Sequence, residues 1–360
     1  MPPSIEYGDY LQLDRILGSQ QPESDRTGKP AHDEMLFIVT HQAYELWFKQ
    51  ILFEIQSVMH LLERPSLNDN SPDLQLIVHR LSRVVTILKL LVQQIEVMET
   101  MTPMDFLDFR DMLRPASGFQ SWQFKLIEAK LGLRFEDRYG KEYYISQLSN
   151  EKAEVIRSAE TERSILELVN EWLERMPFFN ESSNWSSFQT TATIAPLFDA
   201  GPEEGGKKFW AVYYECYCNS LDPSEQANIA SFNEVFWEKK SDGVSFTKRS
   251  LSPRASRAAL FIMLYRGYPI LQLPFQLLQV LLETDEQLSI WRYRHMSMVQ
   301  RMIGTRIGTG GSTGRNYLKG ALDAHEIFRP LAGLTSFLIE RHRLPSLPVE
   351  MERRLGFERR

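Results

Sequence analysis

Seven histidines are the side chains best suited to bind a metal or move a proton in this 360-residue chain. His295 has the most informative setting, because it lies at the centre of an apolar stripe with helical spacing. The stripe consists of Leu288, Trp291, Met298, Val299 and Met302. A buried neutral imidazole needs partners for both ring nitrogens, and a haem iron in the interior of a helical bundle satisfies one of them. The same pattern also fits an ordinary core histidine.

His41 forms a second candidate site together with Phe37. The two residues are four positions apart, so both side chains lie on one face of a helix. Ile38, Tyr44 and Phe48 make the surroundings apolar. One interpretation is a core histidine bonded to a backbone carbonyl, and the other is a histidine that faces a bound ligand.

Arg110 follows Phe106 by four residues in the segment DFLDFRDM. An arginine beside an aromatic face can hold a carboxylate through two parallel hydrogen bonds. An intrahelical ion pair with Asp105, Asp108 or Asp111 is the alternative. The spacing favours neither interpretation over the other.

Residues 308–314, GTGGSTG, form an unusual glycine-rich segment. Its glycines let the backbone approach a ligand closely, and Ser312 or Thr313 can cap the helix that follows. A P-loop ends in GK[ST] and follows a strand, so a nucleotide-phosphate site is disfavoured. We expect a flexible lid over a small substrate, to which Thr309 offers its hydroxyl group.

Long helices must position these side chains, and helical periodicity dominates the chain. Strand signals are sparse, so the sequence predicts an all-α fold, a bundle of long helices with a pocket for an apolar ligand or cofactor. The expected helices cover residues 33–63, 72–101, 103–113, 119–131, 152–176, 253–265, 274–304, 315–328 and 331–341, with further helical segments in 208–237. Ser71-Pro72, Thr102-Pro103 and Ser252-Pro253 supply the caps of three of them.

The chain is expected to form one helical domain over residues 1–360. Within it, residues 1–31 are predicted to form an N-terminal arm and loop. Residues 178–208 and 238–251 are rich in polar residues and are predicted to be surface excursions.

The composition excludes several classes of protein. Hydrophobic residues make up 43% of the chain and its formal net charge is −6, so the basic excess of a nucleic-acid-binding protein is missing. The sequence contains neither an apolar run long enough for a membrane span nor the features of a signal peptide. Cys216 and Cys218 exclude a disulfide framework, fit the reducing cytoplasm and are interpreted as small buried hydrophobes.

Five segments together resemble the tryptophan 2,3-dioxygenase family. They are YGDYLQLDRIL (7–17), HDEMLFIVTHQAYELWFKQILFE (32–54), DFLDFRDMLRPASGFQSWQF (105–124), WRYRHMSMVQRMIGTRIGTGGSTG (291–314) and YLKG (317–320). These segments occur in the order of the family and extend over most of the chain. The resemblance implies a cytoplasmic homotetramer that uses haem b and O₂ to convert L-tryptophan to N-formyl-L-kynurenine, the first step of the kynurenine pathway.

The resemblance also implies a role for particular residues. His295 would be the axial ligand of the haem iron, and His41 the distal histidine that faces the indole N–H. Arg110 would pair with the carboxylate of the substrate. The remaining implied contacts are Phe37 and Phe106 on the indole, Thr309 on the substrate ammonium and a haem propionate, Ser117 and Gly118 on the distal side of the haem, and Tyr7, Tyr10 and Leu11 in the pocket of a neighbouring subunit.

Two rival interpretations predict different site residues. A relative with another indole substrate should have lost Arg110 or Thr309, and both are present. A haem sensor or a helical scaffold without catalytic activity would need neither the glycine-rich lid nor an arginine that holds a carboxylate.

Overall fold

The structure is a computed structural model that describes residues 5–65, 67, 71–176, 178–179, 181–189, 204–237, 250–306, 308 and 314–356. Helices dominate these residues and no strand occurs among them, which confirms the all-α prediction. The α-helices are α1 (Tyr7–Leu11), α2 (Leu13–Leu17), α3 (Glu23–Arg26), α4 (Asp33–Leu62), α5 (Pro72–Met98), α6 (Pro103–Arg110), α7 (Trp122–Leu131), α8 (Lys141–Ser146), α9 (Asn150–Thr161), α10 (Ile165–Glu174), α11 (Glu204–Ser220), α12 (Asn228–Phe236), α13 (Pro253–Leu264), α14 (Pro269–Ile303), α15 (Gly314–Ala324), α16 (Arg329–Gly333) and α17 (Val349–Leu355).

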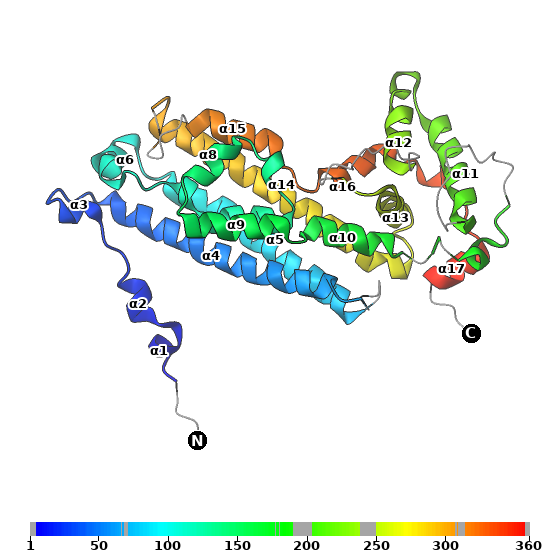
Figure 1. The fold of residues 1–360 in the computed structure, drawn as a ribbon, viewed down its shortest axis with the longest axis horizontal. Helices are drawn as coiled ribbons and strands as arrows, with labels where there is room; N and C mark the ends of the chain where they lie inside the picture. Colours follow the sequence, from blue (N-terminus) through cyan, green and yellow to red (C-terminus); the bar gives the residue numbers. More distant parts are fainter. Residues whose placement is uncertain are drawn as a thin grey trace.

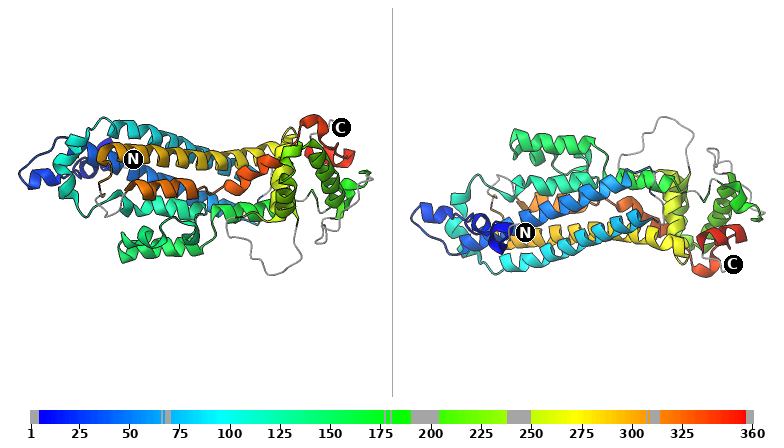
Figure 2. Two further views of the ribbon diagram at one scale, coloured as in Figure 1. Left: turned by 90° about the horizontal axis from the view of Figure 1, so that it is seen from above. Right: turned by 90° about the horizontal axis from the view of Figure 1, so that it is seen from below.

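Three long helices form the body of the molecule. Helix α5 packs against both α4 and α14, and α7 and α15 lie alongside α4 and α14 respectively. Helix α9 covers the outer side of α7 (Figure 2). A second group, α11, α12, α13 and α17, lies at the opposite end of the bundle from α6 (Figure 1). The long helices therefore bring residues from distant parts of the sequence side by side.

Local sequence signals explain where the long helices begin. The Ser71 hydroxyl accepts a hydrogen bond from the Leu74 N–H at 3.3 Å, and Pro72 occupies the first helical position of α5. Thr102 and Asp105 form a reciprocal capping box at the start of α6. The predicted helices 33–63, 72–101 and 253–265 are confirmed, whereas α14 is one continuous helix that begins at Pro269, five residues before the expected start.

Two predicted helices differ from the structure. The segment 152–176 contains two helices, because Ser164 begins a new one: its hydroxyl accepts from the Glu167 N–H, and the Glu167 carboxylate accepts from the Ser164 N–H at 2.8 Å. The predicted helix 331–341 is replaced by α16 and two short 3₁₀ turns. There the carbonyl of Phe337 accepts from the Tyr213 hydroxyl at 2.6 Å, so a tertiary contact takes the place of a helical one.

The first part of the predicted surface excursion 178–208 lies in the core instead. Four aromatic side chains of this segment are buried, namely Phe178, Phe179, Trp185 and Phe188. They pack around Phe209 of α11 and Phe261 of α13. The free energy gained by burying four aromatic side chains outweighs the preference of the polar residues between them for water. Helix α11 begins at Glu204, inside the predicted excursion, and the second excursion, 238–251, lies almost wholly outside the described residues.

The N-terminal arm leaves the bundle. Helices α1 and α2 point away from the long helices in Figure 1, and they bury no residue. Gln12, between them, has a φ of 54°, which breaks the segment into two short helices. None of the helices among the described residues is both long enough and apolar enough to cross a membrane.

Candidate active site

A cavity of about 300 Å³ lies between α4, α6, α7, α14 and α15. This volume is within the range of small-molecule sites. Its wall is mostly apolar, with a few convergent polar groups. Seven of the residues singled out from the sequence line it: Phe37, His41, Phe106, Arg110, Ser117, Gly118 and His295.

His295 projects from α14 into this cavity. Its ring stacks on Trp291, one turn earlier, with ring centroids 5.0 Å apart and an interplanar angle of 9°. The buried Nδ1 atom has no hydrogen-bond partner among the described residues. Burial, together with a smaller effect of the nearby His41, lowers the pKa of His295 to about 4, so the ring is neutral at physiological pH. A neutral imidazole on an apolar wall is the state in which histidine binds a metal.

His41 lies on α4 and shares the cavity with His295. Its Nδ1 atom is 2.7 Å from the carbonyl oxygen of Phe37, which can only accept, so Nδ1 carries the proton. Burial lowers the pKa of His41, although the bond to Phe37 opposes this shift. In the neutral ring Nε2 therefore has a free lone pair. The bond from Nδ1 to the Phe37 carbonyl is the one that the core interpretation predicted. The ligand-facing interpretation also fits, because His41 lines the cavity.

His325 is the third histidine in the wall, and both of its nitrogens are engaged. Its Nε2 accepts a hydrogen bond from the Tyr139 N–H at 3.1 Å, and its Nδ1 lies 3.5 Å from a carboxylate oxygen of Glu128. His342 is exposed and does not line this cavity. His295 is therefore the histidine of this wall that is best suited to hold a metal.

Arg110, Phe37 and Phe106 line the cavity next to α6. The Arg110 side chain is buried, and it lies 3.9 Å from the carboxylate of Asp111, which is exposed. The Phe37 ring lies 4.1 Å from the His41 ring and 5.8 Å from Phe106, and Phe109 packs edge-on against both phenylalanines. A buried cation beside flat aromatic rings suits a planar aromatic ligand with a carboxylate.

The loop between α6 and α7 closes one side. Ser117 caps a 3₁₀ turn, Gly118–Gln120, and its hydroxyl accepts from the Phe119 N–H at 3.3 Å. Lys125 on α7 donates to the carbonyl of Phe119 and lines the same cavity. Burial lowers the pKa of Lys125 to about 8. These contacts hold the Ser117–Gly118 backbone against the cavity.

The structure does not bring every candidate residue to this cavity. Tyr7 and Tyr10 are about three-quarters exposed on the arm, and Leu11 is half-buried there, away from the cavity of its own chain. Thr309 lies outside the described residues, as does most of the glycine-rich segment. Gly308, at its start, lines the cavity.

The sequence analysis did not assign several further cavity residues to a site. Trp291, Glu128, Arg292 and His325 are among them. The sequence placed Trp291 only in the apolar stripe. In the structure its ring lies 4.9 Å from that of Phe124, and this contact joins α7 to α14 in the cavity wall. Arg292 and Glu128 resemble solvent-exposed helix residues in the sequence, yet both are buried. The position of Arg292 next to Trp291 was the available signal.

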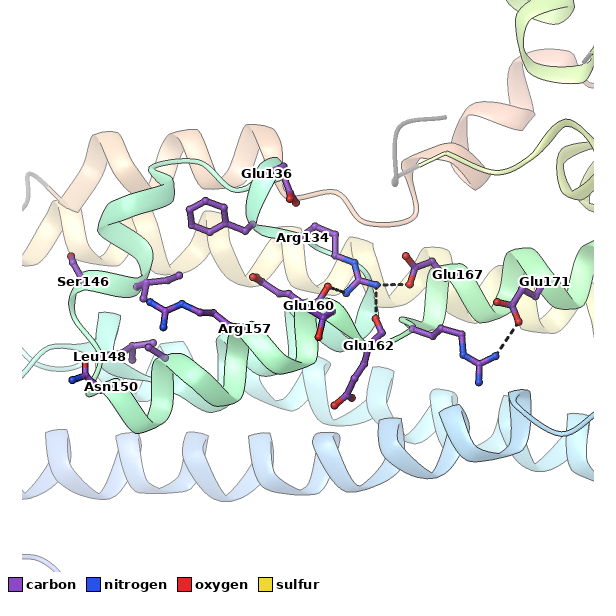
Figure 3. Close-up of a pocket in the computed structure, with 15 residues that line it drawn as sticks. Arg134, Glu136, Ser146, Leu148, Asn150, Arg157, Glu160, Glu162, Glu167 and Glu171 are labelled. Atoms are coloured by element: carbon purple, nitrogen blue, oxygen red, sulfur yellow. Dashed lines mark hydrogen bonds and ion pairs between the residues drawn. The ribbon is translucent and has the colours of Figure 1, made fainter. Parts of the chain in front are cut away.

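A second hollow on the outside of the bundle has a different character. It is an open groove of about 1060 Å³ beside α8, α9 and α10, lined by Arg134, Arg157, Arg163 and several glutamates (Figure 3). Arg134 binds the Glu167 carboxylate and the carbonyl oxygens of Glu160 and Glu162. Among the described residues, the groove is lined by three arginines, five glutamates and a single aromatic residue, Phe135, and no histidine lines it.

Comparisons with known proteins identify the family of this chain. The family model described as tryptophan 2,3-dioxygenase matches residues 2–338. The chain belongs to the tryptophan 2,3-dioxygenase family. The tryptophan 2,3-dioxygenase of Alteromonas mediterranea is 43% identical over 98% of this chain and 97% of its own length. The enzyme of Bdellovibrio bacteriovorus is 43% identical over 99% of both chains, and that of Mus musculus is 42% identical over 95% of this chain and 84% of its own.

The cavity fits the haem that membership of this family implies. No group of three or more His, Cys, Asp or Glu side chains suited to a metal ion occurs among the described residues. A single histidine cannot hold a bare ion, whereas a porphyrin brings the other ligands itself. His295 has a buried ring nitrogen that is unpaired within the described part of the chain, and its setting is apolar, so it is suited to be the protein ligand of such a group.

Proposed function

We propose that this protein is a haem-dependent tryptophan 2,3-dioxygenase, which inserts both atoms of O₂ across the indole C2=C3 bond of L-tryptophan to give N-formyl-L-kynurenine. The observation that carries the proposal is one apolar cavity that contains two neutral histidines and a buried arginine. Membership of the family over residues 2–338 supports the same reaction.

When bound, haem b supplies the iron at which O₂ becomes reactive toward the indole ring. In this proposal His295 would be the protein ligand of the haem iron. Trp291 stacks on the ring of His295 and limits its rotation. Ser117 and Gly118 lie on the α6–α7 side of the cavity and would contact the haem there.

Arg110 would bind the substrate carboxylate. A buried guanidinium with two parallel N–H groups selects a planar anion and fixes its orientation. Phe37 and Phe106 would pack on the indole, with Phe106 presenting a ring without a hydroxyl group. Thr309 would bind the substrate ammonium, as the family resemblance implies. Holding the amino acid at both ends places the indole C2=C3 bond at a fixed position, and such positioning lowers a barrier by several kcal/mol.

His41 would orient the indole N–H. Its Nδ1 proton is held by the carbonyl of Phe37, so Nε2 is available as an acceptor. An indole N–H is a very weak acid, and the pKa of His41 is below its ordinary value. The ring therefore accepts a hydrogen bond rather than removing the proton before attack.

We further propose a homotetramer in the cytoplasm. The outer face of α4 exposes large apolar side chains, including Leu46 at 55% and Phe53 at 71%, and such patches mark interaction surfaces. Tyr7 and Tyr10 are 74% and 73% exposed on an arm that buries no side chain of its own. In the proposed assembly Tyr7, Tyr10 and Leu11 enter the pocket of a neighbouring subunit.

The test is product formation by haem-loaded, reduced protein with L-tryptophan and air. A product heavier than tryptophan by two oxygen atoms, both derived from ¹⁸O₂, is expected. His295→Ala serves as the matched control and should lose haem. Absence of product from a protein whose haem spectrum responds to tryptophan would refute the catalytic role.

A further inference from the structure

A buried cluster of charges adjoins the cofactor cavity on the side of α7. The Glu128 carboxylate is bound by Arg292 of α14 at 2.7 Å and by Arg138 at 2.5 Å. His325 lies 3.5 Å from the same carboxylate. All four side chains are buried.

The two arginines are held at several further points. Arg292 also donates to the carbonyl of His325 at 3.3 Å, and Arg138 donates to the carbonyl of Lys125 at 3.2 Å. Arg138 pairs in addition with Glu160 at 3.0 Å, which lines the outer groove of Figure 3. The cluster is therefore rigid and extends from the cavity to the outer groove.

Glu128 is charged in this setting, and His325 is not. The two arginines and His325 overcome the effect of burial and hold the pKa of Glu128 well below its ordinary value. Burial lowers the pKa of His325, whose Nε2 accepts from Tyr139 and leaves Nδ1–H for Glu128. On the cavity wall, Glu128 is thus the anion that balances the Arg292 cation.

Stability alone does not explain such a cluster. Apolar residues of similar volume often stabilise a core as well as a buried ion pair does, because desolvation offsets much of the attraction. Arg292 lies three residues before His295, so the two side chains are neighbours on the surface of α14. The opposite charges of Glu128 and Arg292 therefore lie next to the proposed iron ligand.

We propose that Glu128 and Arg292 are positioning residues whose opposite charges set the ferric–ferrous equilibrium of the haem held by His295. This inference rests on the proposed haem function. Ferric haem takes up one electron and loses one positive charge, so a nearby cation favours the ferrous form and a nearby anion favours the ferric form. Only the ferrous form binds O₂, so this balance sets how much enzyme is ready to react.

The effect is large enough to measure. The axes of packed helices lie roughly 8–10 Å apart, so we take roughly 10 Å as the separation between these charges and a group held in the cavity. At that distance, with an effective dielectric constant of about 20, one unit charge changes an equilibrium on the order of tenfold. Removing either charge should shift the ferrous-to-ferric ratio by about that factor, in opposite directions for the two residues.

The experiment is a spectroelectrochemical titration of the full-length, haem-loaded protein. Glu128→Gln should raise the midpoint potential, and Arg292→Gln should lower it. Arg292→Lys and the double variant Glu128→Gln/Arg292→Gln should stay near the unchanged protein, because their charge balance is preserved. Glu54→Gln is the matched control, since Glu54 is also a buried carboxylate paired with an arginine, Arg83 at 2.7 Å, but does not line the cavity.

Each outcome decides the inference. Opposite shifts for the single variants, with a restored potential in the double variant, support it. Shifts in one direction only, no shift, or a shift in Glu54→Gln as large as in Glu128→Gln overturn it. If Glu128→Gln does not fold, the comparison of Arg292→Gln with Arg292→Lys decides. A protein that binds no haem at all refutes the proposed function instead, and the first absorption spectrum reveals this.

Discussion

Replacement of Arg110 tests the substrate site most directly. The Arg110 side chain is 6% exposed, so its removal would leave the carboxylate of a bound substrate in a buried site without that cation. Loss of one partner of a buried, hydrogen-bonded charge pair costs about 3–5 kcal/mol. Arg110→Ala should therefore lower kcat/KM for L-tryptophan by roughly 10²- to 5 × 10³-fold. Arg110→Lys keeps the charge but loses the paired geometry, and we expect a loss of about tenfold to a hundredfold.

The assay is the initial rate of product formation, followed by near-ultraviolet absorbance, over a range of L-tryptophan concentrations. Haem content is measured in every sample. Arg157→Ala is the matched control, because Arg157 is exposed on α9 and pairs with Glu154 at 3.3 Å on the surface. Tryptamine, which lacks the carboxylate, should bind equally to the unchanged protein and to Arg110→Ala.

Two results would refute the reasoning about Arg110. One is a fall in haem content that parallels the fall in activity, since Arg110 would then support the cavity rather than the substrate. The other is an equal loss of tryptamine binding, which would show that the contact does not involve the carboxylate.

Three other perturbations test the histidines and the arm. The rate should fall as the pH decreases through the lowered pKa of His41, because protonated Nε2 cannot accept the indole N–H, and a pH–rate profile of His41→Gln should lack this fall. Burial lowers the pKa of His295 from 6.5 to about 4, so the unfolded chain binds a proton before the folded chain does as the pH falls. The free energy of unfolding of the cofactor-free protein should therefore decrease by up to about 3 kcal/mol between pH 6.5 and pH 4. Urea titrations of His295→Gln should show a smaller decrease. A chain that begins at residue 19 should keep its haem and lose activity, and sedimentation velocity will show whether the tetramer persists; full activity without the arm would contradict its role in a neighbouring pocket.

The sequence by itself determined the features that depend on neighbours within a few turns of a helix. Ser71-Pro72 and Thr102-Pro103 mark helix starts because capping is a contact between residues two or three positions apart. Phe37 and His41 share a face because the helical repeat places residues four apart together, and their rings do lie 4.1 Å apart. The stripe around His295 predicted an apolar wall on the same grounds.

Only the tertiary structure decided which of these faces meet. Glu128 pairs with Arg292, a residue 164 positions away, and no local pattern in either helix predicts that contact. The aromatic side chains of 178–188 are buried because α11 and α13 pack around them, against the polar composition of their own segment. Capping and periodicity are short-range interactions fixed by the chain itself, whereas a cavity and a buried charge pair exist only after packing has removed water from between distant helices.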